Sequence, residues 1–272
     1  MKRSNRLLAA ATMPFLLLPG AVLAQSEDPG SAAPSAPAAS PGVATQLPLE
    51  GMRWHLREYR AEDGGMAGAS DGAWIRLDGG ALTGSTGCND LAGSYTLEGD
   101  TLTFTGITPT EASCLDGDLV AQEMAVLARL PEVVSFAFQP ARGRDATDLM
   151  LVDAGDGSHL AFVSIQGRTY TPMYGGDEPM PEGIVTVRFE NGMASGEGPC
   201  NAFSGPFTQD DLSVAIGPLE TAGKACPDAE LETEFLGDLE LARSYDFQFG
   251  DLILLDEQGA PIRTYAVVST GS

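Results

Sequence analysis

The sequence predicts a mainly β protein: two tandem small antiparallel β-barrel-like domains, each with one α-helix, after a signal peptide and a disordered linker. Three observations support this. The chain starts with the charge pattern of an export signal, a segment rich in Pro, Ala and Ser follows, and the remainder contains an internal repeat marked by cysteines. We expect a signal peptide over 1–24, a linker over 25–48, a first domain over 49–164 and a second, diverged domain over 165–272.

The first segment has the three parts of a secretory signal peptide. A basic start (Lys2, Arg3 and Arg6) precedes the apolar run Leu7–Leu23, and small residues then place the cut after Ala24. The alternative is a retained membrane anchor, but prolines interrupt the run, and a spanning helix needs about 20 apolar residues. We therefore expect a periplasmic or secreted protein with no membrane span after signal cleavage.

The expected linker, residues 25–48, consists mostly of Pro, Ala, Ser and Gly and has few large apolar side chains. Such a segment cannot bury enough apolar surface to offset the entropy lost on ordering. We therefore expect a flexible tether ahead of the folded domains.

Net charge limits the classes of partner. The formal net charge is −23 at pH 7, and Lys224 is the only lysine after the signal peptide. A strongly negative protein repels nucleic-acid phosphates and anionic lipid surfaces, so neither class is expected as a partner. A neutral or basic partner stays compatible with the charge, as does a plain role in keeping the protein dissolved.

The four cysteines reveal a repeat. Cys88 and Cys114 are 26 residues apart, as are Cys200 and Cys226, and the two pairs are offset by 112 residues. Other features share this offset, as expected for an internal duplication. They are Ile75–Asp78 over Val187–Glu190, Gly80 over Gly192, Gly84 over Gly196, Asn89 over Asn201, and Gly93 over Gly205.

Each copy has the same expected order of elements. Alternating apolar residues predict strands, and a hairpin turn is expected at 98–100 in the first copy and at 209–211 in the second. One helix follows in each copy, with Val120, Met124 and Leu127, or Leu231, Phe235, Leu239 and Ala242, on its apolar face. Closing strands complete what we expect to be a small barrel with the helix at one end.

In an oxidising compartment, equal cysteine spacing within each copy predicts two disulfides, Cys88–Cys114 and Cys200–Cys226. Pairing across the copies is an alternative that needs the two hairpins to be adjacent. A redox-active pair is disfavoured because the sequence has no CxxC motif.

We expect no catalytic residue, no metal site and no cofactor. His55 and His159 are the only histidines and fall in different elements, and we expect His55 to be a strand residue rather than a general base. The segment 153–157 lacks the acids of a calcium loop and reads as a turn. The matched arginines Arg76 and Arg188 are either solvent-facing residues paired with nearby acids or markers of a shared contact site.

These elements resemble the META domain family, also called HslJ-like. The first copy carries its motifs in order: Trp54-His55-Leu56, Gly87-Cys88-Asn89, Gly93-Ser94-Tyr95, Thr110 through Cys114, and Glu123 on the helix. The second copy departs from the pattern. Pro199 replaces the glycine before Cys200-Asn201, Gly205-Pro206-Phe207 stands for Gly-x-Tyr, and Thr221 lies one residue too far from Cys226, whereas Glu234 fits the helix position.

The resemblance implies a small β-barrel with one helix, envelope location, no established catalytic activity and motif residues that serve as scaffold. We therefore expect a non-enzymatic exported envelope protein with a stress-related or interaction role in the periplasm and an unknown envelope protein as partner. The alternatives are a barrel that binds a small apolar ligand and an inhibitor of an exported hydrolase. A ligand barrel would have an internal cavity, whereas a scaffold would be filled by Trp54, Trp74, Phe104 and Phe189.

Overall fold

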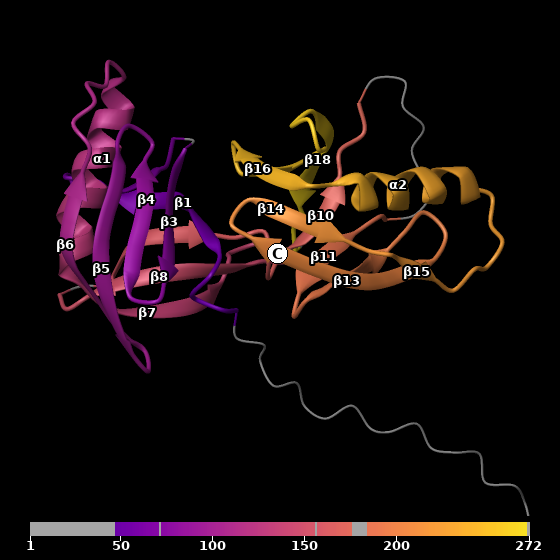
Figure 1. Ribbon diagram of the computed structural model, residues 1–272, viewed down its shortest axis with the longest axis horizontal. Coiled ribbons are helices and arrows are strands. Elements are labelled where there is room, and N and C mark those ends of the chain that lie inside the picture. Colours follow the sequence, from indigo (N-terminus) through magenta and orange to yellow (C-terminus); the bar gives the residue numbers. More distant parts are fainter. Residues whose placement is uncertain (1–46, 71, 156, 176–183, 271–272) are drawn as a thin grey trace, which may run out of the picture. The chain divides into compact units, whose positions relative to one another are not determined.

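The computed structural model describes residues 47–70, 72–155, 157–175 and 184–270 of the 272-residue chain (Figure 1). The expected signal peptide and almost all of the expected linker lie outside the described residues. The described part contains two antiparallel sheets and two α-helices. Among these residues, neither helix combines the length and the apolar character needed to cross a membrane.

The first sheet closes into a barrel of eight strands. Around the barrel the order is β1-β3-β4-β5-β6-β7-β8-β9, β9 pairs back onto β1, and β2 adds to β1 at the side. Helix α1 (Gly117–Arg129) and a short 3₁₀ turn η1 (Leu130–Glu132) connect β6 to β7. The strands are β1 (Arg53–Arg60), β2 (Met66–Gly68), β3 (Ala73–Asp78), β4 (Ala81–Thr86), β5 (Asp90–Glu98), β6 (Thr101–Pro109), β7 (Val133–Pro140), β8 (Thr147–Asp153) and β9 (Ser158–Val163).

The second sheet repeats this plan. Its order is β12-β11-β10-β18-β17-β16-β14-β13-β15, and β12 also pairs with β13, so the sheet returns on itself. Helix α2 (Ala229–Leu241) precedes β16, as α1 precedes β7. The strands are β10 (Thr169–Pro172), β11 (Val187–Glu190), β12 (Met193–Glu197), β13 (Ala202–Asp210), β14 (Ser213–Ile216), β15 (Glu220–Thr221), β16 (Ser244–Gln248), β17 (Asp251–Leu255) and β18 (Pro261–Val267).

Apart from β2 and β15, the two copies correspond strand by strand. The first strand of each, β1 or β10, pairs with the last, β9 or β18, and with the next strand around the barrel, β3 or β11. The mainly β fold with two barrel-like domains, each with one helix, is therefore confirmed.

Matched glycines show why the repeat retains its spacing. A Cβ on Gly84 would lie 2.4 Å from the carbonyl oxygen of Trp74, and one on Gly196 would lie 2.0 Å from that of Thr186. Both distances are shorter than any ordinary carbon–oxygen contact. Only glycine therefore allows the neighbouring strands to approach this closely at these two equivalent positions.

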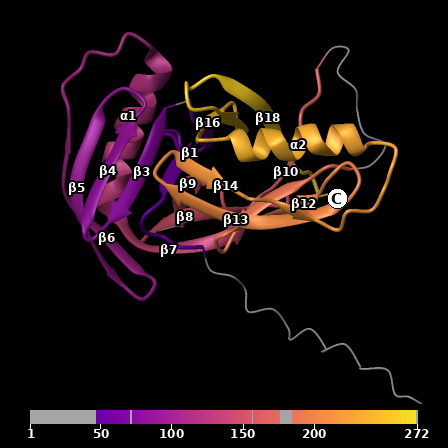
Figure 2. The ribbon, with the colours of Figure 1, turned by 45° about the vertical axis from the view of Figure 1, so that its right-hand side comes forward.

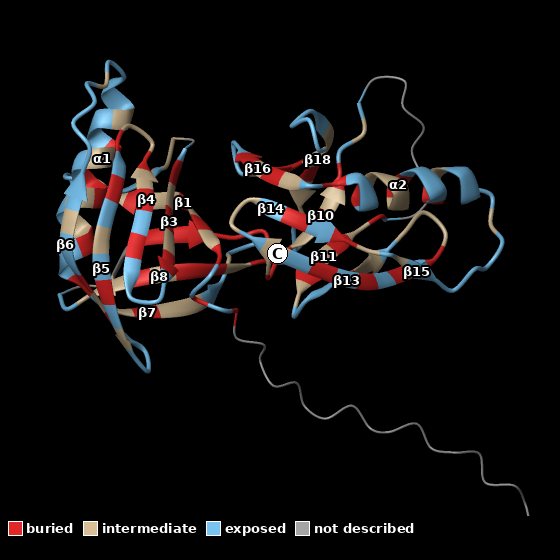
Figure 3. Cartoon of the chain, in the orientation of Figure 1, coloured by how far each residue is buried: buried red, intermediate tan, exposed pale blue. Residues whose placement is uncertain are grey.

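Large side chains fill the interior of both domains. Figure 3 marks the buried positions in red along the strands of both domains. Trp54, Phe104 and Phe189 are buried, as expected, and the indole N–H of Trp54 donates to the carbonyl of Leu49 at 2.9 Å. Trp74 differs from the expectation. It is only partly buried on the outer face of β3, where the guanidinium of Arg53 lies 3.6 Å from the ring centroid, a cation–π geometry.

The predicted apolar face of the first helix is wrong. Val120 and Met124 are 38% and 56% exposed, and α1 instead buries Gln122 together with Ala125 and Val126. The Gln122 amide accepts from the N–H of Ser70 and donates to the carbonyl of Thr86, both at 2.7 Å. These two bonds orient the helix, which packs on β1, β4 and β9 (Figures 1 and 2).

Candidate functional site

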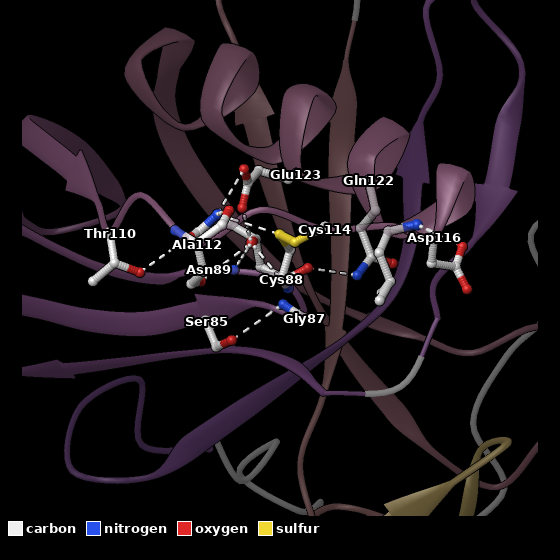
Figure 4. Close-up of a disulfide and its surroundings, with 12 residues drawn as sticks. Ser85, Gly87, Cys88, Asn89, Thr110, Ala112, Cys114, Asp116, Gln122 and Glu123 are labelled. Atoms are coloured by element: carbon white, nitrogen blue, oxygen red, sulfur yellow. Dashed lines mark hydrogen bonds between the residues drawn. A yellow bond between two sulfur atoms is a disulfide. The ribbon is translucent and has the colours of Figure 1, made fainter.

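The family motifs converge where the β4–β5 loop meets the segment before the helix. A disulfide joins Cys88 in the loop to Cys114 in that segment, with Cα atoms 6.0 Å apart (Figure 4). Cys200 and Cys226 form the equivalent bond in the second copy, with Cα atoms 5.9 Å apart. Both predicted disulfides are confirmed. Each covalently ties a hairpin loop to the N-terminal approach of a helix.

Asn89 is the polar centre of the first junction. Its Oδ1 accepts from the backbone N–H of Ala112 at 2.7 Å and from the hydroxyl of Thr110 at 2.8 Å, and its Nδ2 donates to the carbonyl of Ala112 at 3.2 Å (Figure 4). The side-chain amide thus pairs with both the N–H and the C=O of one residue, as a neighbouring strand would. It holds the segment before α1 against the loop, next to the disulfide.

Glu123 connects this loop to the helix. Its Oε2 accepts from the hydroxyl of Thr86 at 2.6 Å, and its Oε1 accepts from Nδ2 of Asn89 at 3.1 Å. Thr86 Oγ1 in turn accepts from the backbone N–H of Asn89 at 3.0 Å and of Cys88 at 3.3 Å. Both carboxylate oxygens are therefore engaged in holding the junction together.

The second junction uses a different glutamate from the one expected. Asn201 pairs with the peptide of Lys224 as Asn89 pairs with Ala112, with Oδ1 accepting at 2.9 Å and Nδ2 donating at 3.2 Å. The carboxylate, however, comes from Glu232. It accepts from the N–H of Cys200 at 3.0 Å, from the N–H of Asn201 at 2.6 Å and from Nδ2 of Asn201 at 2.8 Å.

Glu234 does not belong to the second junction. Its side chain is 59% exposed and forms an ion pair with Arg263 at 3.4 Å. Residues 232 and 234 are two apart, so they point to different sides of a helix with 3.6 residues per turn. A useful signal in the sequence was Glu232, one turn before position 235, which is the equivalent of Glu123 at the 112-residue offset.

The other motif residues have structural roles. Gly87 has φ +90°, a conformation that L side chains rarely adopt. A Cβ on Gly93 would lie 3.2 Å from the carbonyl oxygen of Thr105, and one on Gly205 would lie 2.4 Å from that of Pro218. Tyr95 is buried, and its hydroxyl donates to the carboxylate of Glu50. Burial, and next the hydrogen bond to Glu50, raise the pKa of Tyr95.

His55 lies on the outer face of β1. Its ring meets the ring of Phe247 edge-on, with centroids 5.0 Å apart. Burial, and secondarily the positive charge of Arg53, lower the pKa of His55 to about 3, so the imidazole is neutral at pH 7. This environment suits a packed aromatic residue.

The matched arginines lie where residues of the two copies meet. Arg76 pairs with Asp210 of the second copy at 3.1 Å, and Arg188 pairs with Asp145 of the first at 3.5 Å. Each also pairs with an acid two residues further along its own strand, namely Asp78 and Glu190. Both interpretations of these arginines therefore describe part of the structure. In the part of the chain that is described, no group of three or more His, Cys, Asp or Glu residues is arranged to hold a metal ion.

The META domain model matches the chain twice, over residues 47–167 and 163–268. This chain belongs to the META domain family. Each match contains one barrel-like domain with its disulfide, its buried asparagine and its helix glutamate. The resemblance seen in the motifs thus extends to both copies, including the second, in which Pro199 and Glu232 depart from the expected pattern.

Two solved structures are similar to part of this chain. An NMR structure of a protein from Burkholderia xenovorans is 24% identical, covers 49% of this chain and 97% of its own length, and has a TM-score of 0.36. A second NMR structure is 19% identical, covers 43% of this chain and 91% of its own length, and has a TM-score of 0.31. A search of curated proteins gives no match to this chain.

Proposed function

We propose that this META-family chain is a non-enzymatic protein of the cell envelope, exported with a cleaved signal peptide and acting in the periplasm through interactions that help the cell under stress. The observation that carries the proposal is the junction present in both copies. In each, a disulfide and a glutamate with both oxygens engaged hold a loop to a helix.

Two structural disulfides favour an oxidising compartment, since cytosolic thiols are kept reduced. The basic and apolar start of the sequence is consistent with export to such a compartment. Export also gives the disulfides a purpose. They hold each small domain folded where cytosolic chaperones are absent.

The packed interiors favour an interaction role over the storage of an apolar ligand inside a barrel. Trp54, Leu77 and Leu149 are fully buried in the first domain, and Tyr170, Phe189 and Tyr265 in the second. Molecules would therefore be bound on the outer surfaces of the strands and loops.

Export is tested by expressing the full chain in a host with a periplasm and fractionating the cells. We expect the periplasmic form to begin after Ala24, and its non-reduced mass to be lower than its reduced mass by four hydrogens. Retention in the cytoplasm with free thiols would contradict export.

The stress role is tested by complementation. A deletion strain that carries the full gene should regain growth under envelope stress. A matched gene lacking the codons for residues 2–24 should not restore growth.

The absence of catalysis is tested separately by offering the purified protein panels of ester, peptide, glycoside and phosphate substrates. We expect no turnover above that of a heat-denatured sample. A reproducible turnover that one point mutation abolishes would refute the non-enzymatic role.

A further inference from the structure

An arginine-rich cavity lies on the outer side of the first domain. It has a volume of about 1220 Å³ and extends along β1 and the turn between β7 and β8. Its lining includes two carboxylates, Glu58 and Asp148, and five arginines: Arg57, Arg60, Arg142, Arg144 and Arg168. The described lining thus has three positive charges in excess, although the whole chain has a net charge of −23.

Three of these arginines have no carboxylate partner among the described residues. Arg60 donates to the carbonyl of Gly64 at 2.9 Å, and Arg142 and Arg144 are exposed in the β7–β8 turn. The chain has 38 acidic and 15 basic residues, so carboxylates far outnumber the basic side chains that could pair with them. Seven arginines of the described ranges do pair with an acid: Arg53, Arg57, Arg76, Arg129, Arg168, Arg188 and Arg263. Four arginines of these ranges have no such pair. Arg60, Arg142 and Arg144 line this cavity, and Arg243, outside it, donates to the carbonyls of Glu240 and Ala242.

The fold positions the other two arginines on one buried carboxylate. Asp148 is 2% exposed and pairs with Arg57 at 2.9 Å on one oxygen and with Arg168 on the other. A β-bulge between Leu56 and Glu58 places Arg57 as the additional residue of β1 opposite β9. Glu58 lies 2.5 Å from Arg57, so Asp148 and Glu58 together balance Arg57 and Arg168. The three excess positive charges of the lining therefore belong to Arg60, Arg142 and Arg144.

The hydrogen-bonding capacity of these guanidiniums is also underused. A guanidinium has five N–H donors and no acceptor. The Nε atoms of Arg57, Arg60 and Arg168 are buried and have no hydrogen-bond partner among the described residues. Buried donors without acceptors are costly and therefore rare in folded proteins. The cavity thus combines uncompensated charge with unused donors, and both favour an anion.

The remaining lining limits the anion to a small molecule with an apolar part. Phe247 and Phe249 belong to the lining, and Phe249 is 93% exposed in the β16–β17 turn with φ +52°. An aromatic side chain at this position offers a face on which an apolar group can pack. The negative charge of the whole chain disfavours large polyanions, which would extend beyond the cavity into repulsive surroundings.

We propose that this cavity binds a small organic anion, a carboxylate or a phosphate ester, whose charged group is held by Arg57, Arg60, Arg142, Arg144 and Arg168 and whose apolar part packs against Phe247 and Phe249. Guanidinium groups bind both kinds of anion through paired N–H donors. This site goes beyond the proposed envelope role and does not depend on export.

Isothermal titration of the purified protein with both disulfides intact tests the proposal. The probes are phenyl phosphate, benzoate and inorganic phosphate, with benzylammonium as a cationic control, at low ionic strength. We expect one saturable site per chain for phenyl phosphate or benzoate. Inorganic phosphate should bind more weakly because it lacks the apolar part, and benzylammonium should not bind. Comparison of the two aromatic anions decides between phosphate and carboxylate.

Variants then locate the site. Arg142→Gln/Arg144→Gln changes two exposed turn residues, so the protein should fold normally, and anion binding should weaken at least about tenfold because charge-assisted bonds are lost. Arg129→Gln/Arg243→Gln removes the same charge outside the lining and should change affinity less than about twofold. Absence of saturable binding by every anion, or equal loss in both double variants, would overturn the proposal. Anion binding by a protein that is not exported would leave this site standing and refute only the envelope role.

Discussion

The two junctions satisfy the same backbone groups with different residues. In the first copy, the hydroxyl of Thr86 accepts from the N–H groups of Cys88 and Asn89 and donates to the carboxylate of Glu123. In the second copy, the residue equivalent to Thr86 is Gly198, and Glu232 accepts directly from the N–H groups of Cys200 and Asn201. The loss of a hydroxyl is thus compensated by a carboxylate.

This difference shows which property of the junction was maintained. The glutamate of the second copy lies one helical turn earlier, since position 235 rather than 232 is the equivalent of Glu123 at the 112-residue offset. Residues three apart share a helix face, so the carboxylate reaches further toward the loop without turning away from it. Buried N–H groups need acceptors, and either arrangement provides them.

The largest effect should come from the disulfides, in which the two copies are alike. Both close loops of the same spacing, so the chain-entropy model gives each about 3–4 kcal/mol of stability. We expect Cys88→Ser/Cys114→Ser and Cys200→Ser/Cys226→Ser each to destabilise its own domain by about this amount. Urea unfolding measures the first domain by tryptophan fluorescence, because both tryptophans lie there, and hydrogen exchange measures the second. A much smaller loss in one copy would show that its junction bonds hold without the disulfide.

The glutamates should separate the copies. Glu232→Ala removes the acceptor of two backbone N–H groups, and we expect a loss of about 2–4 kcal/mol in the second domain. Glu123→Ala should cost about 1–2 kcal/mol in the first, because Thr86 still accepts from the backbone. Hydrogen exchange of the Asn201 and Asn89 amides reports the two sites separately.

Glu234→Ala is the matched control and should change stability by less than about 0.5 kcal/mol, since its ion pair is exposed. Equal losses of stability in Glu232→Ala and Glu123→Ala would argue against the idea that Glu232 replaces the hydroxyl of Thr86 as the backbone acceptor.

Gly198 sharpens the comparison further. A Cβ there would lie 2.9 Å from the carbonyl oxygen of Asn201 and 3.2 Å from Oε2 of Glu232. Restoring the residue of the first copy with Gly198→Thr should therefore displace the carboxylate and cost about 1–3 kcal/mol. The double change Gly198→Thr/Glu232→Ala should cost less than the sum of the two single changes, which a double-mutant cycle would measure. Additive losses would show that the two residues do not compete for the same space.

The sequence alone was sufficient to predict the repeat, because the residues that mark it lie close together in the sequence of each copy. Cysteines, matched glycines and strand alternation each lie within one copy, and Gly84 and Gly196 mark close backbone approaches that no other residue permits. The disulfide partners followed from spacing and compartment. The family motifs added Asn89 and Glu123, whose contacts agree with a scaffold role.

Features that depend on three-dimensional contacts were missed. The buried face of α1 contains Gln122 in place of Val120 and Met124. A pattern of apolar residues cannot mark this polar side chain as buried, because its partners at Ser70 and Thr86 come from distant segments. Glu232 was overlooked because the alignment at a fixed offset hides a shift by one turn. The arginines of the cavity come from β1, the β7–β8 turn and position 168, which only barrel closure brings together.

The last comparison concerns His55, which has no equivalent in the second copy, where Thr171 follows Tyr170. Its pKa is lowered to about 3 from an ordinary value of 6.5. Below about pH 6.5 the imidazole binds a proton in the unfolded chain but stays neutral in the folded domain. The free energy of unfolding therefore decreases as the pH is lowered from about 6.5 to about 3. The slope is at most about 1.4 kcal/mol per pH unit. His55→Gln should lack this term, so the two proteins should converge in stability as the pH falls from about 7 to about 4.5. Tryptophan fluorescence during urea unfolding follows the first domain in both, and parallel pH profiles would show that burial does not keep the imidazole neutral.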